Sequence, residues 1–169
     1  MRAMLDQSIG DSAHVTEVQV RWAECDPAGI VYYPQFFTYF EVGCTDFFAT
    51  RIGSDDWRAY FRRHGLMWTP RIEVTARFRA SARCYERLNV HTRIADVARK
   101  IITLEFQIKR KSDDQLLAEG QVKAVFTNAD GHAASIPPAV ADWLLYGGPP
   151  PEPNATTGPT VNSPASTNS

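Results

Sequence analysis

Hydrophobic and polar residues alternate in five separate stretches of the chain, a pattern typical of β-strands that bury one face. The stretches are His14 to Glu24, Arg71 to Arg79, and residues 87–94, 102–109 and 116–126. Residues 97–100 and 112–114 are short enough to be hairpin connections between neighbouring strands. The pattern therefore predicts an antiparallel sheet, and we expect Gly120 to mark a β-bulge in its last strand.

One stretch has helical spacing and is apolar on more than one face. It runs from Pro34 to about Ile52, and its apolar residues are Phe36, Phe37, Tyr39, Phe40, Val42, Cys44, Phe47 and Phe48. A helix that is apolar nearly all round is a buried helix. Pro34 suits the first turn because proline has no N–H to leave unpaired there, and Gly53 is a suitable C-terminal stop.

Two shorter helices are predicted from their first residues. Ser54 to Asp56 can cap a helix that continues through Arg63, and Pro137-Pro138 can start another that ends near Leu145. A long buried helix beside amphipathic strands predicts an α+β fold, in which a curved antiparallel sheet wraps around the helix. Such a sheet leaves an open edge strand, and pairing of edges between two subunits would cover it.

The length of 169 residues favours one domain. Residues 1–13 lack any periodicity, so we expect a flexible arm there, followed by the folded domain over residues 14–146. Gly, Pro, Ser, Thr and Asn dominate residues 147–169, which gives this segment little to bury and predicts a disordered tail.

Charge and cysteine content narrow the functional classes. A net charge of -1 with 22% charged residues provides no general attraction for nucleic acid or membranes. No apolar run approaches the ~18 residues of a membrane span, and the first ten residues lack a secretory core, so we expect a cytoplasmic protein. Three cysteines and four histidines without ligand spacing predict neither a disulfide framework nor a metal site.

The segment before the long helix carries the candidate chemistry. Pro27 keeps Asp26 out of the helical region and Gly29 allows a sharp bend, so Asp26 lies on a tight turn. The unpaired amides at the helix start, near Tyr32 and Tyr33, face this turn. A carboxylate opposite such donors can hold a polarised carbonyl for acyl transfer. The alternative is that Asp26 merely stabilises the turn.

These residues also resemble a known family. The run Cys25-Asp26-Pro27-Ala28-Gly29-Ile30-Val31-Tyr32-Tyr33-Pro34 is similar to the signature of the 4-hydroxybenzoyl-CoA thioesterase family of hotdog-fold proteins. The resemblance extends from about Val15 to Leu144. It implies the hotdog fold, hydrolysis of an acyl-CoA to free acid and coenzyme A, and no cofactor beyond the coenzyme A carried by the substrate.

The resemblance also implies roles for site residues. Asp26 is the catalytic residue, as nucleophile or as general base, and the backbone amide of Tyr33 points at the thioester oxygen. Cys25 is an alternative nucleophile, although a small packed residue is the simpler interpretation. No GxSxG motif is present, so a serine mechanism is not expected. Homodimers or homotetramers with clefts shared between subunits follow from the same resemblance.

Candidate substrate contacts complete the hypothesis. Pro34 and Thr69-Pro70 match the aromatic-acyl branch of the family, although Trp68 is bulkier than the residue expected there. Glu41 aligns with an acidic residue that reaches the hydroxyl of the acyl ring, or else it is a buried glutamate satisfied by a backbone group or a partner. Arg99-Lys100 resembles the clamp for coenzyme A phosphates, or is a solvated turn.

The sequence thus predicts an acyl-CoA thioesterase, with an acyl group of the benzoyl or hydroxybenzoyl type. Two alternatives remain open. One is hydrolysis of short-chain aliphatic acyl-CoA or of acyl-carrier-protein thioesters. The other is a non-catalytic hotdog protein that binds acyl-CoA, because a fold does not guarantee an activity.

Overall fold

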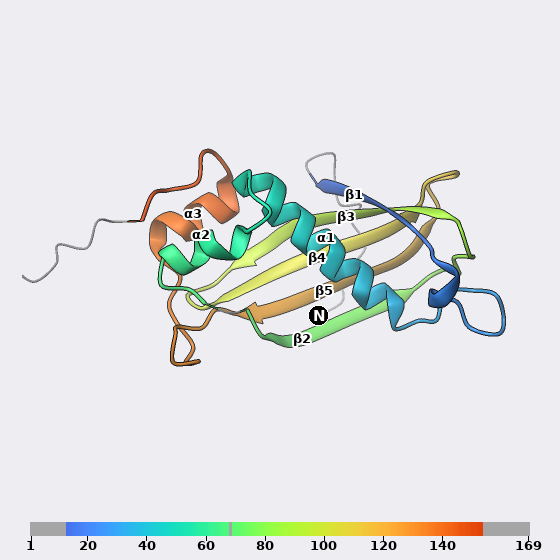
Figure 1. Cartoon of the computed structure of the whole chain (residues 1–169), viewed down its shortest axis with the longest axis horizontal. Coiled ribbons are helices and arrows are strands. Elements are labelled where there is room, and N and C mark those ends of the chain that lie inside the picture. Colours follow the sequence, from blue (N-terminus) through green and yellow to red (C-terminus); the bar gives the residue numbers. More distant parts are fainter. Residues whose placement is uncertain (1–12, 68, 154–169) are drawn as a thin grey trace, which may run out of the picture.

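A five-stranded antiparallel sheet curves around the longest helix, as Figure 1 shows for this computed structural model. The structure describes residues 13–67 and 69–153, so most of the predicted arm and tail, residues 1–12 and 154–169, lies outside the described residues. The strands are β1 (His14–Gln19), β2 (Arg71–Phe78), β3 (Arg87–Val97), β4 (Ile101–Arg110) and β5 (Leu116–Val125), in the spatial order β1-β3-β4-β5-β2. The predicted antiparallel sheet is therefore confirmed.

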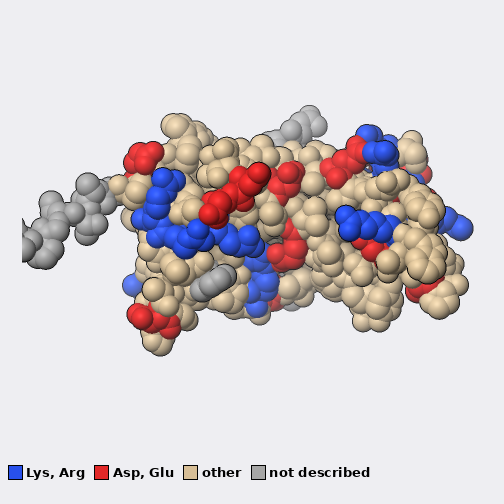
Figure 2. Space-filling model, in the orientation of Figure 1, with Lys and Arg blue, Asp and Glu red and all other residues tan. Residues whose placement is uncertain are grey.

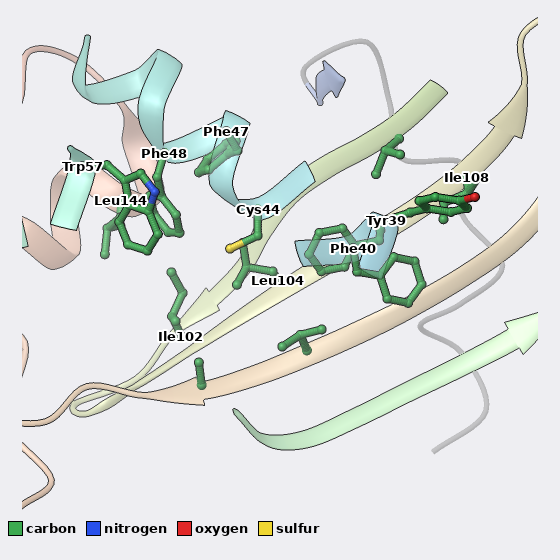
Figure 3. Close-up of a cluster of buried hydrophobic side chains, with 14 of the residues drawn as sticks. Tyr39, Phe40, Cys44, Phe47, Phe48, Trp57, Ile102, Leu104, Ile108 and Leu144 are labelled. Carbon is green, nitrogen blue, oxygen red and sulfur yellow. The ribbon is translucent and has the colours of Figure 1, made fainter. Parts of the chain in front are cut away.

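The central helix α1 (Gln35–Ile52) crosses the inner face of the sheet and carries most of the aromatic core. Figure 3 shows Tyr39, Phe40, Cys44, Phe47 and Phe48 projecting from it among side chains of the strands. The Phe40 ring stacks on Phe106 of β4 at 4.7 Å between centroids. Gly53 ends the helix with φ 74°. The predicted buried helix and its stop are thus confirmed.

Gly120 serves a different purpose from the one we predicted. It pairs in register with Ala76 on one side and Phe106 on the other, so the predicted bulge at Gly120 is wrong. A β-carbon there would lie 2.8 Å from the Phe40 ring and 2.4 Å from the carbonyl oxygen of Thr75. The glycine is needed because α1 packs so closely on the sheet at this point. Register shifts occur instead at Arg71/Glu73, Ile94/Asp96 and Ile108/Lys109.

Two edges of the sheet differ from the sequence pattern. β1 ends at Gln19, five residues earlier than predicted, and the chain turns into a 3-10 helix, η1 (Trp22–Glu24). β2 has the predicted alternation, yet Ile72, Val74 and Phe78 are 53%, 43% and 46% exposed. Among the described strands β2 pairs with β5 alone, so in a single chain its apolar residues are not covered.

Two short helices, α2 (Trp57–Arg63) and α3 (Pro138–Tyr146), pack at the end of the sheet where α1 finishes. The Asp56 side chain caps α2 by accepting from the amide of Ala59, as predicted. Arg51 joins α1 to α3 by donating to the carbonyl oxygens of Trp143 and Leu144. Within the described part of the chain, no helix is long and apolar enough to cross a membrane.

Candidate functional site

Asp26 lies on a tight turn immediately before α1. Its amide donates to the carbonyl oxygen of Ile30 at 2.9 Å, and its own carbonyl oxygen accepts from Gly29, whose φ is 75°. The carboxylate oxygen Oδ1 accepts from the amide of Ala28 at 2.8 Å. Oδ2 has no hydrogen bond among the described residues. One oxygen therefore stabilises the turn while the other remains available.

The amide of Tyr33 is also available. The neighbouring amide of Tyr32 donates to the carbonyl oxygen of Glu24, and the amides of Gln35 and Phe36 make the first bonds of the helical turn. Within residues 13–67 and 69–153, no acceptor is bonded to the Tyr33 amide. It lies at the positive end of the α1 dipole, so an anionic or polarised oxygen is stabilised there.

Glu24 and Tyr39 hold this turn against α1, a contact that we did not predict. Glu24 Oε2 accepts from the amide of Arg21 at 2.8 Å and from the hydroxyl of buried Tyr39 at 2.7 Å. Burial and the Glu24 carboxylate raise the pKa of Tyr39, so its hydroxyl stays a neutral donor. Glu24 follows Arg21 by three residues, the spacing of a capping box, but Arg21 is not the Ser or Thr of that motif, and no sequence signal links Glu24 to Tyr39.

Arg71 brings together two predicted substrate residues, Glu41 and Thr69. Its Nε and Nη2 donate to the two oxygens of Glu41 at 2.7 and 2.5 Å. Its Nη1 donates to the carbonyl and hydroxyl oxygens of Thr69 at 2.7 and 3.0 Å. Glu41 thus has a partner within the fold, as one of its two interpretations predicted, but the predicted burial is wrong because its side chain is 49% exposed. Reasoning from the sequence missed Arg71.

A pocket of about 500 Å³ opens beside this ion pair, between α1, α2 and the start of β2. Its lining residues are Glu41, Trp57, Arg58, Phe61, Leu66, Met67, Thr69, Pro70, Arg71 and Phe126. The walls are mostly aromatic or aliphatic, with charges from three side chains. Figure 2 shows that Lys and Arg residues form a band over the end of the molecule that carries α2. The predicted contact Trp68 lies outside the described residues.

Arg99 and Lys100 lie apart from Asp26 in a single chain. They form the turn between β3 and β4, at the end of the sheet near α2 and α3, whereas α1 begins at the opposite end. Arg99 Nε donates to Ser135 Oγ at 3.1 Å, and Lys100 Nζ donates to the carbonyl oxygen of Ala133 at 2.9 Å. One chain therefore does not bring this basic turn to the Asp26 turn.

The remaining reactive groups offer no competing centre. Burial raises the pKa of the Cys25 thiol, and the neighbouring Cys84 adds to the rise. A thiol with a raised pKa carries little thiolate, so Cys25 is a poor nucleophile. In the part of the chain that the structure describes, no three His, Cys, Asp or Glu side chains gather as metal ligands.

Comparison with known proteins identifies relatives. A family model described as thioesterase-like superfamily matches residues 20–144. The 4-hydroxybenzoyl-CoA thioesterase of Pseudomonas sp. (strain CBS-3) is 26% identical over 129 residues, which cover 75% of this chain and 91% of that protein. Its solved structure matches with a TM-score of 0.66 over 74% of this chain and 94% of that one, at 26% identity.

Two further solved structures are similar. A hypothetical protein from Thermus thermophilus is 31% identical, with a TM-score of 0.66 over 77% of this chain and 95% of its own. The 1,4-dihydroxy-2-naphthoyl-CoA thioesterase from Synechocystis shares the fold at 23% identity, with a TM-score of 0.64 over 74% and 90% of the two chains. The family match spans most of this chain. The chain thus belongs to the thioesterase-like superfamily and has the hotdog fold that its sequence predicts.

Proposed function

We propose that this protein is an acyl-CoA thioesterase that hydrolyses an aromatic acyl-CoA to the free acid and coenzyme A. One observation carries the proposal: the turn before α1 presents a carboxylate oxygen of Asp26 and the amide of Tyr33, both without partners among the described residues. Thioester hydrolysis needs a base or nucleophile and an oxyanion donor, and these two groups meet both needs.

The Tyr33 amide stabilises the oxygen of the tetrahedral intermediate. A positioned oxyanion donor contributes about 2.7 to 4 kcal/mol, whereas a helix dipole contributes about 0.3 to 1 kcal/mol, so the direct hydrogen bond dominates. Asp26 then acts in one of two ways. It attacks the thioester carbon and displaces coenzyme A to form a mixed anhydride, which water then hydrolyses to the free acid and the Asp26 carboxylate, or it removes a proton from a water that attacks the thioester carbon directly. Coenzyme A leaves as the thiol in both routes, and no other cofactor takes part.

An aromatic acyl group fits the surroundings of the site. The Pseudomonas relative is named for 4-hydroxybenzoyl-CoA. The resemblance of Pro34 and Thr69-Pro70 to the aromatic-acyl branch supports the same class of acyl group. The pocket beside Glu41 is walled by Trp57, Phe61 and Phe126. Aromatic side chains pack edge-on or offset against a ring, which adds about 0.5 to 1.5 kcal/mol per contact beyond burial of area.

A dimer through β2 would complete the cleft. β2 is an edge strand of eight residues with exposed Ile72, Val74 and Phe78, and the Phe78 ring contacts Tyr33 at 6.0 Å between centroids. Antiparallel pairing of two β2 strands would bury these groups and remove the open edge. It would also turn the α2 end of one protomer toward the α1 start of its partner.

This assembly would explain why the predicted phosphate clamp lies far from Asp26 in one chain. The turn with Arg99 and Lys100 of one protomer would serve the Asp26 turn of the other, and the cations suit the phosphates of coenzyme A. We further propose a cytoplasmic location. The free thiols of Cys25, Cys44 and Cys84 support it, since thiols persist in reducing compartments.

Thiol release from a panel of thioesters tests the proposal. The panel contains benzoyl-, 4-hydroxybenzoyl-, acetyl- and hexanoyl-CoA at equal concentrations. We expect the aromatic thioesters to have the highest kcat/KM. Faster hydrolysis of the aliphatic thioesters would assign the enzyme to the short-chain class. No hydrolysis of any member, with binding of coenzyme A retained, would make the protein a binding module.

A further inference from the structure

In the pocket between α1, α2 and β2, the hydrogen-bond acceptors Glu41 and Thr69 have partners, whereas two of the donors have none among the described residues. Its side-chain acceptors are already paired. Glu41 binds Arg71 through both carboxylate oxygens, and Thr69 binds Arg71 through its hydroxyl and carbonyl oxygens. The guanidinium of Arg71 also reaches Cys44 Sγ at 3.7 Å, so all of its five N–H groups have acceptors. The ion pair is thus closed, and neither partner needs a ligand.

Two donors among the lining residues, the guanidinium of Arg58 and the indole N–H of Trp57, have no hydrogen-bond acceptor in the described part of the chain. The guanidinium of Arg58 stacks over the Trp57 ring at 4.3 Å and makes no hydrogen bond or ion pair among the described residues. Its neighbour on the same helix, Arg62, is paired with Asp56 at 3.1 Å. The indole Nε1 of Trp57 is buried and also has no partner in this part of the chain.

Arg58 is one of the residues that line the pocket, together with Trp57 and Glu41. Burial raises the pKa of the Cys44 thiol to about 12, and the cations of Arg71 and Arg58 oppose this rise. A pocket with paired acceptors and unpaired donors is complementary to a ligand that brings acceptors of its own, above all an anion.

We propose that this pocket receives the far end of the acyl group, that this end carries a carboxylate, and that Arg58 is the specificity-determining residue that binds it. The inference rests on the proposed thioesterase function and names its substrate class, an aromatic acyl-CoA with a second carboxylate opposite the thioester. The aromatic ring would pack on Trp57, Phe61 and Phe126.

The distance along α1 between the Tyr33 amide and the pocket sets how far the acyl group must extend. Glu41 follows Tyr33 by eight residues, which is about 12 Å along a helix axis. In this arrangement the acyl group would extend from the Tyr33 amide along α1 toward Glu41, with its far substituent directed at the pocket. A hydroxyl in place of the carboxylate would meet the closed Glu41–Arg71 pair and would gain less from Arg58, because it carries no charge.

Matched substrates test the inference. We expect kcat/KM for 4-carboxybenzoyl-CoA to exceed that for 4-methylbenzoyl-CoA by at least about tenfold, which corresponds to about 1.4 kcal/mol. In Arg58→Gln this ratio should fall to between one and two. In the control Arg63→Gln, which removes a cation of the same helix that does not line the pocket, the ratio should stay as in the unmodified protein. A ratio near one in the unmodified protein, or an unchanged ratio in Arg58→Gln, would overturn the inference.

A binding measurement separates this inference from the proposed activity. Isothermal titration calorimetry compares benzene-1,4-dicarboxylate with 4-methylbenzoate, and it requires no turnover. We expect the dicarboxylate to bind at least about tenfold more tightly, and Arg58→Gln to abolish the difference. If no thioester is hydrolysed but this result is found, the thioesterase proposal fails and the carboxylate pocket stands. If thioesters are hydrolysed and both acids bind alike, the pocket inference fails alone.

Discussion

The two carboxylate oxygens of Asp26 have different surroundings. Oδ1 accepts from the amide of Ala28 and so stabilises the turn, while Oδ2 has no partner among the described residues. The sequence left a turn role and a catalytic role as alternatives. The structure shows that one side chain has room for both, because an aspartate needs a single oxygen for its turn.

For other residues of the site, the sequence did not show which side chain each one binds. Glu41 was a candidate substrate contact, yet its carboxylate binds Arg71, which lies 30 residues further along the chain. A pair so distant in sequence leaves no local pattern. Glu24 and Tyr39 are 15 residues apart and were missed for the same reason.

Tyr39→Phe tests whether this brace positions Asp26. The change removes the hydroxyl that donates a hydrogen bond to Glu24. The free energy of unfolding should fall by about 1 kcal/mol, so Tm should fall by about 2 to 4 °C. Since Glu24 holds the turn, kcat should fall by about tenfold with little change in KM. Calorimetry and steady-state kinetics measure both effects. Tyr146→Phe, at an exposed tyrosine, is the matched control. An unchanged kcat in Tyr39→Phe would show that the brace is structural alone.

The elements themselves could be predicted well because each has a local cause. Apolar residues at helical spacing, with Gly53 as a stop, predicted α1 to its last residue. The alternation of apolar and polar residues predicted the strands, but it did not show where β1 ends or that β2 lies at an edge of the sheet. β1 ends at Gln19 because the chain then turns into η1, and β2 is exposed because it is the last strand of the sheet.

Gly120 shows how one element constrains another. The Phe40 ring of α1 occupies the space where a side chain of β5 would lie. We expect Gly120→Ala to lower the free energy of unfolding by about 1 to 3 kcal/mol, because the added methyl group overpacks the core beside the backbone of Thr75. Denaturant unfolding measures the change. A midpoint equal to that of the unmodified protein would mean that α1 shifts at no cost.

At the scale of the whole molecule, the Asp26 turn and the predicted phosphate clamp are far apart in a single chain. Asp26 precedes α1 and the Arg99-Lys100 turn joins β3 to β4, and α1 begins at the end of the sheet opposite to that turn. A second subunit would therefore be needed for one coenzyme A to be bound by both, as we propose. No sequence pattern within one chain shows which edge of the sheet pairs with a second subunit, so the complete cleft could not be predicted from the sequence.

Substitution of a charged residue into one edge strand at a time, β2 or β1, tests which edge forms the interface. Val74 of β2 and Val15 of β1 are exposed to similar extents, 43% and 47%. We expect Val74→Glu to yield a monomer with little thioesterase activity, because two copies of the new carboxylate would oppose each other across the axis. Val15→Glu should keep both the dimer and the activity. Light scattering after size-exclusion chromatography measures the mass. A dimer in Val74→Glu and a monomer in Val15→Glu would place the interface at β1.

The turnover of Asp26→Asn tests the central claim most directly. Asparagine keeps an oxygen that can accept from Ala28, so the turn, the Tm and the binding of coenzyme A should be retained. The amide can act neither as base nor as nucleophile, and we expect kcat on the best aromatic thioester to fall by about 10² to 10⁴. A kcat within twofold of the unmodified protein would contradict the account and remove Asp26 from the mechanism.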